Sequence, residues 1–392
     1  MTISSPRPVP PPRRASNDRN RVLLVDDSAV YRGLVRRELE KCDDIEIVGS
    51  CGDGAAAVRT LKTVAADVVV LDIEMPVMDG LTALPKLIET QPSIKVIMAS
   101  TLTVRNADIS LRALQMGAAE TVAKPTTSRL SSDAQRFVDE LIRKIRALGD
   151  ASRAGRRAIP ATPGRPASLA GRAAPSPGLL RAGTPVAIAP TLRPAPTRAP
   201  AIIAIGASTG GPKALISLLR AMVKSVTVPI VITQHMPPTF TSILAEHIER
   251  ATGRRTQEGK DGMPVANEHI YVAPGDYHMT LRREAPGSVA IHLDQNPPES
   301  FCRPAVDPML RSVAQCYGAS ALAIILTGMG QDGAEGAKAL ATAGGFVVAQ
   351  DQATSVVWGM PQAAAKAGVC SAILPLDGIA PYLAKLAVRH AA

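Results

Sequence analysis

The chain has 392 residues, an apolar fraction of 46% and a formal net charge of +10. This length allows two or three domains, and the composition is normal for globular proteins with packed cores. No apolar run approaches the roughly 18 residues of a membrane span, and residues 1–20 lack the apolar segment of a secretory signal, so we expect a cytoplasmic protein without membrane insertion.

The positive charge is concentrated in two segments outside the predicted domains. Residues 151–200 contain eight arginines, ten prolines and no acidic residue, and residues 1–20 contain four arginines and one aspartate. These segments carry +8 and +3, which leaves the rest of the chain at −1. We therefore predict no nucleic-acid partner. The composition instead predicts a disordered tail at 1–20 and a disordered Pro/Ala/Arg-rich linker at 149–199, between domains at 21–148 and 200–390.

Short apolar runs alternate with amphipathic stretches along the first domain. Strands are predicted over 21–25, 45–48, 68–71, 96–99 and 121–123. Helices are predicted over 29–41, 54–64, 81–89, 105–116 and 129–147. Five strand–helix units joined by right-handed crossovers predict an α/β domain with a doubly wound, flavodoxin-like parallel sheet, whose site lies at the carboxyl ends of the strands.

Polar residues stand at four of those strand ends: Asp26, Asp27, Asp72, Ser100 and Lys124. Converging carboxylates repel one another unless a cation joins them, and Mg²⁺ is the hard ion that carboxylates select. We predict that Asp72 accepts a phosphoryl group whose oxygens Lys124 and Ser100 engage. Each residue alone has a structural explanation, such as a helix cap or a surface ion pair, but the combination favours phosphoryl transfer. The predicted Mg²⁺ ligands are Asp26, Asp27, Asp72 and the backbone carbonyl of Glu74.

The motifs Asp26-Asp27-Ser28, Leu-Asp-Ile-Glu-Met-Pro-Val-Met-Asp-Gly at 71–80 and Lys124-Pro125, together with Ser100, resemble those of response-regulator receiver domains over about residues 21–145. The resemblance implies phosphorylation at Asp72 by a histidine kinase, and a cis peptide bond before Pro125. Thr121 departs from the family pattern, because a switching Tyr or Phe is usual at that position. A second departure is Pro85, whose missing N–H should kink the third helix.

A glycine-flanked serine opens the second domain. The apolar run from Ile202 is typical of a buried strand, and Pro212 marks the start of a helix. Ser208 therefore lies on a strand-to-helix turn, and Gly206, Ser208 and Gly210 fit the G-x-S-x-G spacing that lifts a nucleophile above a sheet edge. A phosphate cradle or an ordinary turn fits the stretch equally well until partners for Ser208 are found.

The next strand supplies the first candidate partner. The strand predicted over 228–233 delivers Gln234 and His235 at its end. A dinucleotide-binding fold would carry an acid there for the ribose, so the sequence argues against NAD. Because the ends of adjacent parallel strands share one crevice, we expect the His235 imidazole to lie beside Ser208.

A third strand, predicted over 322–326, leads through a glycine-rich loop to Asp332. This carboxylate either caps the following helix or orients His235, and it could do both. A serine, a histidine and an aspartate from three strand ends are the groups that nucleophilic hydrolysis needs, so we predict a catalytic triad of Ser208, His235 and Asp332. The predicted oxyanion donors are backbone N–H groups near Thr209 or Met329.

Five stretches carry a second resemblance: Gly-Ala-Ser-Thr-Gly-Gly-Pro at 206–212, Gln-His-Met-Pro at 234–237, Tyr-Val-Ala-Pro-Gly at 271–275, Arg-Pro-Ala-Val-Asp at 303–307, and Leu-Thr-Gly-Met-Gly-Gln-Asp-Gly at 326–333. They resemble the catalytic domain of the CheB methylesterase family. The resemblance implies hydrolysis of glutamate γ-methyl esters on methyl-accepting chemoreceptors with release of methanol, deamidation of receptor glutamines, and no cofactor for the ester chemistry. It also implies that the receiver domain inhibits the ester site by covering it, through the 105–125 surface, until Asp72 is phosphorylated.

The expected second fold is a Rossmann-like parallel sheet with a hairpin added from 269–293. A transcriptional output would need a helix-turn-helix or a basic domain, and neither is present. An esterase for small molecules stays open, since the sequence does not show the substrate. Arg303 and Asp307 either shape the cleft or form an internal ion pair. We expect free thiols at all five cysteines and surface or core roles for the remaining histidines, which are His247, His269, His278, His292 and His390.

Overall fold

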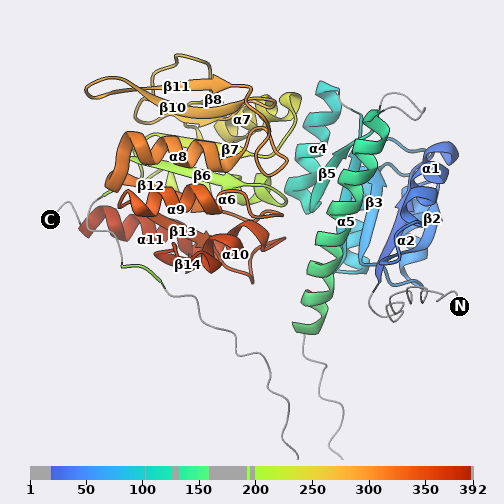
Figure 1. Ribbon diagram of the computed structural model, residues 1–392. Helices are drawn as coiled ribbons and strands as arrows, with labels where there is room; N and C mark the ends of the chain where they lie inside the picture. The colour runs from blue at the N-terminus through green and yellow to red at the C-terminus, as the bar shows by residue number, and fades with distance from the viewer. Residues whose placement is uncertain (1–18, 102, 126–131, 159–191, 195–198, 390–392) are drawn as a thin grey trace, which may run out of the picture.

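The computed structural model describes residues 19–101, 103–125, 132–158, 192–194 and 199–389, which form two α/β units (Figure 1). Residues 1–18 of the predicted tail and most of the predicted linker lie outside the described residues, whereas Asn20, predicted to belong to the tail, is the first residue of a strand. None of the helices in the described ranges is long and apolar enough to cross a membrane.

The first unit is a five-stranded parallel sheet in the order β2-β1-β3-β4-β5, which confirms the flavodoxin-like prediction. Its elements are β1 (Asn20–Val25), α1 (Ala29–Leu39), β2 (Ile45–Cys51), α2 (Gly54–Leu61), β3 (Val68–Asp72), α3 (Gly80–Thr90), β4 (Lys95–Ser100), α4 (Val104–Met116), β5 (Glu120–Ala123) and α5 (Ser132–Ala158). Alternate strand residues pack against α1 and α5 on one face and against α2, α3 and α4 on the other. This is why the strands are apolar on both sides.

Three details differ from the sequence-based predictions. Helix α5 continues to Ala158, about three turns beyond its predicted end, and Ser152 within the extension is buried and donates a hydrogen bond to the Ser93 carbonyl. Helix α3 ends at Thr90, one residue beyond its predicted end, with Pro85 inside it, and the kink expected there stays a prediction. The prediction of a cis bond before Pro125 is wrong, because the cis bond of the described chain lies between Arg303 and Pro304.

The second unit is a seven-stranded parallel sheet in the order β14-β13-β12-β6-β7-β9-β8, with a separate antiparallel hairpin of β10 and β11, as expected. Its strands are β6 (Ile202–Ala207), β7 (Ile230–Gln234), β8 (Thr256–Glu258), β9 (Ile270–Val272), β10 (His278–Ala285), β11 (Ser288–Asp294), β12 (Ala321–Ile325), β13 (Phe346–Gln350) and β14 (Ala372–Leu374). Its helices are α6 (Gly211–Met222), α7 (Pro238–Thr252), α8 (Val306–Tyr317), α9 (Ala334–Thr342), α10 (Gly359–Lys366) and α11 (Leu376–Arg389), with a short 3₁₀ turn at Gly318–Ser320.

Strand β6 lies inside this sheet, between β7 and β12. Its alternate side chains point to opposite faces: Ile203 and Ile205 join the cluster with α6, α7 and α11, whereas Ile202 and Ala204 join the cluster with α8, α9 and α10. The chain leaves β6 toward β7 on one side and later returns as β12 on the other. Ser208 therefore follows the strand at which the order reverses, where open α/β sheets place their ligand crevice.

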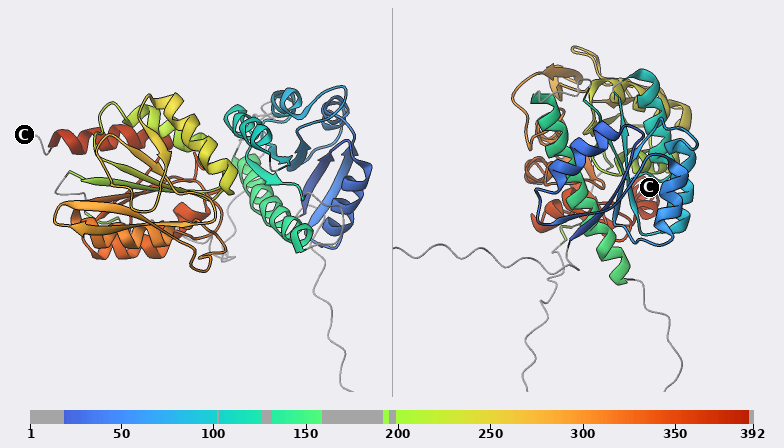
Figure 2. Two further views of the ribbon diagram at one scale, coloured as in Figure 1. Left: turned by 90° about the horizontal axis from the view of Figure 1, so that it is seen from above. Right: turned by 90° about the vertical axis from the view of Figure 1, so that its right-hand side faces the viewer.

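The two units are in contact through α4 and β5 of the first and α6 and α7 of the second (Figures 1 and 2). Buried apolar residues of α4, α6 and α7 belong to one continuous cluster. The surface predicted to cover the ester site, residues 105–125, therefore faces the second unit in this arrangement.

Candidate functional site

The turn between β6 and α6 holds Ser208 by backbone geometry. The Ser208 N–H donates a 3.1 Å hydrogen bond to the Thr327 carbonyl, and its carbonyl accepts one of 2.7 Å from the Gly211 N–H. Gly210 has φ +78°, a left-handed conformation that favours glycine. At Gly328 an added Cβ would lie 2.9 Å from Cβ of Ser208, so the missing side chain lets the backbone of this loop lie against the serine.

His235 follows β7 directly, and its neighbour Gln234 connects the ends of β6 and β7. Ala207 and Gln234 are paired in the sheet register. The Gln234 side-chain amide donates a 2.9 Å hydrogen bond to the Ser208 carbonyl. The residue that replaces the ribose-binding acid of dinucleotide folds thus fixes the serine turn relative to the histidine strand.

The His235 imidazole is bonded to Asp332, as predicted, with 2.7 Å between Nε2 and Oδ2. The Asp332 carboxylate is buried and also accepts the N–H groups of Val306 and Asp307, at 2.6 and 3.0 Å. It therefore caps the N-terminus of α8. Its Oδ1 also accepts the N–H of Gly333, the N-cap residue of α9, at 2.9 Å, so the carboxylate holds His235 and also contacts the start of the following helix. These contacts fix the carboxylate and lower its pKa against the effect of burial.

The other imidazole nitrogen, Nδ1, lies 3.4 Å from Sγ of Cys302. Burial of the imidazole favours its neutral form and would lower its pKa. The hydrogen bond to Asp332 outweighs burial, together with the contact with Cys302 and the charges of both groups. The pKa of His235 is therefore raised to about 10. The sequence predicts Cys302 only as a free thiol. Its position next to Arg303 in a motif of the second resemblance was the one signal available.

Three groups at or near Ser208 are free to take part in chemistry. Within the described part of the chain, the Ser208 hydroxyl makes no hydrogen bond, and the backbone N–H groups of Thr209 and Met329 have no acceptor. Catalytic hydrogen bonds are often formed only when substrate is bound. The turn after β6 thus offers an unbonded hydroxyl and one unbonded donor, and the loop after the neighbouring strand β12 offers a second donor.

A receiver residue contacts this turn. The Thr209 hydroxyl donates a 2.6 Å hydrogen bond to Oε2 of Glu120, the first residue of β5. Oε1 of the same carboxylate accepts the Thr121 N–H at 2.8 Å and lies 3.6 Å from the Lys144 ammonium. Lys144 also donates to the Thr121 carbonyl at 2.6 Å. The position that carries an aromatic switch in related receivers is therefore part of a polar network that ends at the candidate active site.

A second polar contact joins the units further along α4. Nε2 of His247, on α7, lies 2.8 Å from Asp108, and Nδ1 lies 3.0 Å from the amide nitrogen of Gln115. Met329 and Val356 pack against an apolar cluster formed largely by receiver residues. The receiver domain therefore contacts both loops that supply candidate oxyanion donors.

The three aspartates predicted for the acidic site of the receiver lie together, and the Glu74 carbonyl stays a predicted ligand. One carboxylate oxygen each from Asp26, Asp27 and Asp72 lie within 4.8 Å of one another, a spacing that suits a divalent cation. The Lys124 ammonium pairs with Asp26 at 2.6 Å and with Asp72 at 2.7 Å. Burial is the largest influence on Asp72 and raises its pKa, although Lys124 opposes it.

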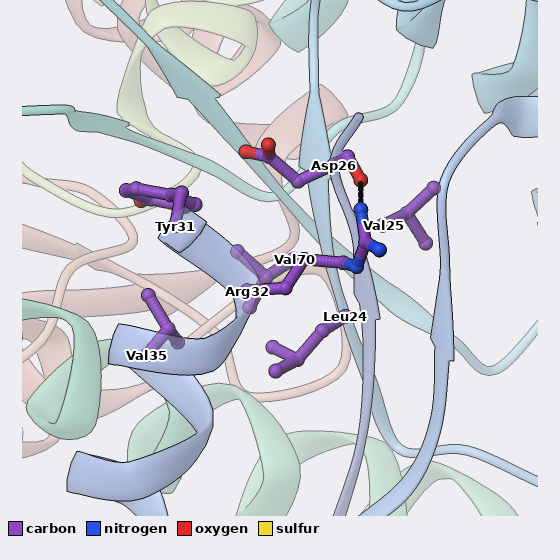
Figure 3. Close-up of a pocket in the computed structure, with 7 residues that line it drawn as sticks. All are labelled: Leu24, Val25, Asp26, Tyr31, Arg32, Val35 and Val70. Carbon is purple, nitrogen blue, oxygen red and sulfur yellow. Dashed lines mark hydrogen bonds between the residues drawn. The ribbon is translucent and has the colours of Figure 1, made fainter. Parts of the chain in front are cut away.

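Residues of α1 contact the backbone and side chains of this acidic site. Figure 3 shows Asp26 at the end of β1, with the Arg32 guanidinium hydrogen-bonded to its backbone carbonyl and Tyr31 nearby on α1. The Lys124 ammonium lies 4.6 Å from the centre of the Tyr31 ring. Ser100 is buried at the end of β4 and accepts a 3.0 Å hydrogen bond from Ser110 of α4, so it connects the acidic site to the interface helix.

Several secondary predictions were also tested. Arg303 pairs with Asp276 at 2.7 Å and not with Asp307, which is buried and accepts the Gly336 N–H. Of the remaining histidines, His278 has the expected core role, bonded to the backbone of Ala305 and Pro297. The described part of the chain contains no disulfide, so the cysteines are free, as expected.

Comparisons with known proteins agree with both resemblances. The family model for CheB methylesterases matches residues 203–383, and that for response regulator receiver domains matches residues 22–134. A protein-glutamate methylesterase/protein-glutamine glutaminase of Paramagnetospirillum magneticum is 54% identical over 397 residues, which cover 100% of both chains. One from Azospirillum brasilense is 52% identical over 98% of each chain. The catalytic domain of a Thermotoga maritima CheB methylesterase is 39% identical, with a TM-score of 0.46, over 47% of this chain and 97% of that one.

Proposed function

Because the chain belongs to the CheB methylesterase family and begins with a receiver domain, we propose that it hydrolyses glutamate γ-methyl esters on chemoreceptors, releases methanol, and also deamidates receptor glutamines. The observation that carries this proposal is the His235–Asp332 hydrogen bond at the strand ends beside Ser208. The relatives' names supply the substrate class, and the site supplies the chemistry.

The proposed reaction uses Nδ1 of His235, the nitrogen that is not bonded to Asp332 and that contacts Sγ of Cys302 in this structure. Asp332 holds Nε2 of His235, so Nδ1 takes the proton of Ser208 while Oγ attacks the ester carbonyl carbon. The negative charge that develops on the carbonyl oxygen is stabilised by the N–H groups of Thr209 and Met329. The proton returns to the methoxy oxygen, methanol leaves, and a water repeats the sequence to release the free carboxylate and the serine.

Control by the receiver is the second part of the proposal. The Glu120–Thr209 bond and the packing around Met329 support an inhibited resting state, in which receptor cannot reach the turn. Asp72 is the proposed phosphoryl acceptor from a histidine kinase. Asp26, Asp27 and Asp72, with the Glu74 carbonyl, would hold Mg²⁺, which neutralises phosphoryl charge when bound. Lys124 and Ser100 would then engage the phosphoryl oxygens, and the movement of Ser100 against Ser110 would reach α4.

The decisive experiment is incubation of the purified chain with receptor carrying labelled methyl esters, followed by measurement of released methanol. We expect release that depends on Ser208 and increases with a small phosphodonor and Mg²⁺. A chain that hydrolyses small esters but leaves methylated receptor unchanged would be an esterase for small molecules, and the proposed substrate would be wrong.

A further inference from the structure

A strained turn lies immediately beside the candidate active site. Glu299 and Cys302 exchange two backbone hydrogen bonds, of 3.1 and 2.8 Å, and the two residues between them, Ser300 and Phe301, have φ values of +52° and +63°. The last residue of the turn is Cys302, whose thiol contacts the His235 imidazole. Phe301 is therefore one residue away from a direct contact with the proposed catalytic base.

Phe301 gains nothing from the fold in this position. Its side chain is 91% exposed, the largest exposed fraction among the large apolar residues of the described chain. Two-residue hairpin turns with positive φ usually carry Asn and Gly, because a Cβ disfavours the left-handed conformation. A residue with a strained backbone and an exposed aromatic ring beside a reaction site is a candidate for binding rather than for stability.

The turn is anchored on both sides, so the position from which the ring projects is fixed. Glu299 pairs with Arg311 of α8. On the other side, Arg303 pairs with Asp276 and also donates to the carbonyls of Gln295 and Asn296. An aromatic side chain has only two rotatable side-chain bonds and loses little conformational freedom on binding, which is why such residues dominate recognition surfaces.

We propose that Phe301 is a substrate-docking residue, whose ring packs on apolar side chains of the receptor helix one or two turns away from the reacting glutamate. Residues three or four positions apart lie on the same face of a helix, so a contact beside His235 reaches the neighbouring turn of a helix whose ester is at Ser208. This inference rests on the proposed function, because it requires a helical protein substrate. It assigns recognition to a residue outside the triad and outside the receiver interface.

The test compares Phe301→Asn with wild type in the full chain, using two substrates. Asn tolerates positive φ, so this variant removes the ring while the turn is kept. With methylated receptor we expect KM to rise roughly tenfold and kcat to stay unchanged, as for loss of uniform binding. With the small substrate N-acetylglutamate γ-methyl ester we expect kcat/KM equal to that of wild type, because this ester is too short to reach the ring.

The matched control is Val77→Asn, assayed without phosphodonor. Val77 is also apolar, 89% exposed and at positive φ (+66°), but it lies in the receiver. It should leave both substrates unaffected. Equal KM values for receptor in wild type and Phe301→Asn, or an equal loss on the small ester, would overturn the inference alone. A wild-type chain active on the small ester but inactive on receptor would overturn the proposed substrate and the inference together.

Discussion

The hydroxyl of Thr209 donates a 2.6 Å hydrogen bond to the carboxylate of Glu120, so the residue after Ser208 is bonded to the first residue of β5 in the receiver. The carboxylate is held on its other side by Lys144 and by the Thr121 N–H. The N–H that we propose for the oxyanion belongs to the same Thr209. A movement of β5 therefore changes the environment of the reacting oxygen directly.

Replacing Glu120 with Ala should raise the resting activity. A hydrogen bond to a charged group contributes about 1.5–3 kcal/mol, so its loss should shift the closed-to-open equilibrium by roughly 10- to 100-fold. Methanol release from receptor without phosphodonor measures the effect. The control is Glu140→Ala, because Glu140 also pairs with Lys144, at 2.7 Å, yet lies on α5. An equal increase in both variants would assign the effect to Lys144 and not to the Thr209 contact.

The triad prediction separates chemistry from stability. Ser208→Ala and His235→Ala should each lower kcat by several orders of magnitude while the fold is kept, because members of a triad act as a unit. Asp332→Asn should lower kcat and also the thermal midpoint, since Asp332 caps α8 through the Val306 and Asp307 N–H groups. Methanol release and thermal unfolding are measured side by side. Near wild-type turnover in a folded Ser208→Ala variant would contradict the mechanism.

Removing the thiol of Cys302 should move the pH profile of hydrolysis. The base must be neutral, so kcat/KM rises with pH until the pKa of His235 is passed. The contact with Cys302 helps to raise that pKa, and Cys302→Ala should therefore shift the rising limb to lower pH. The kcat/KM of the N-acetylglutamate ester is measured across pH. Cys42→Ala, another half-buried free thiol, should leave the limb in place, and an unchanged limb in Cys302→Ala would show that the thiol does not influence the imidazole.

The sequence predicted the elements that follow from local pattern and missed the contacts that depend on the arrangement of the two units. Alternating apolar runs and glycine-rich turns located both sheets, and strand-end logic placed Ser208 and His235 side by side. His247 was expected to have a surface or core role, because nothing in its own helix indicates that Asp108 and Gln115 lie opposite. The contact of Glu120 with Thr209 was not predicted either, because it also depends on how the two units are arranged.

Local pattern also misjudged the end of α5 and did not show the partner of Arg303. The predicted linker was assigned from its Pro and Arg content, but the first prolines come only after Ala158, and α5 continues to that point. The pairing of Arg303 could not be read from spacing, because Asp276 lies 27 residues away on a different loop. Both errors arise where long-range contacts, and not propensity, decide the structure.

Phosphorylation and the Glu120 contact should act on the same equilibrium, and this makes the last prediction. In the wild-type chain, a small phosphodonor with Mg²⁺ should raise methanol release, and Asp72→Asn should abolish the increase while keeping the resting rate. Glu120→Ala has already lost the interface bond, so the phosphodonor should raise its rate by a smaller factor than in wild type. Two changes that break one interface are not additive, whereas independent effects multiply. The rates of wild type and Glu120→Ala, each measured with and without phosphodonor, form a cycle. Full stimulation of Glu120→Ala would show that the phosphorylation signal takes another path, such as the α4 contact with His247.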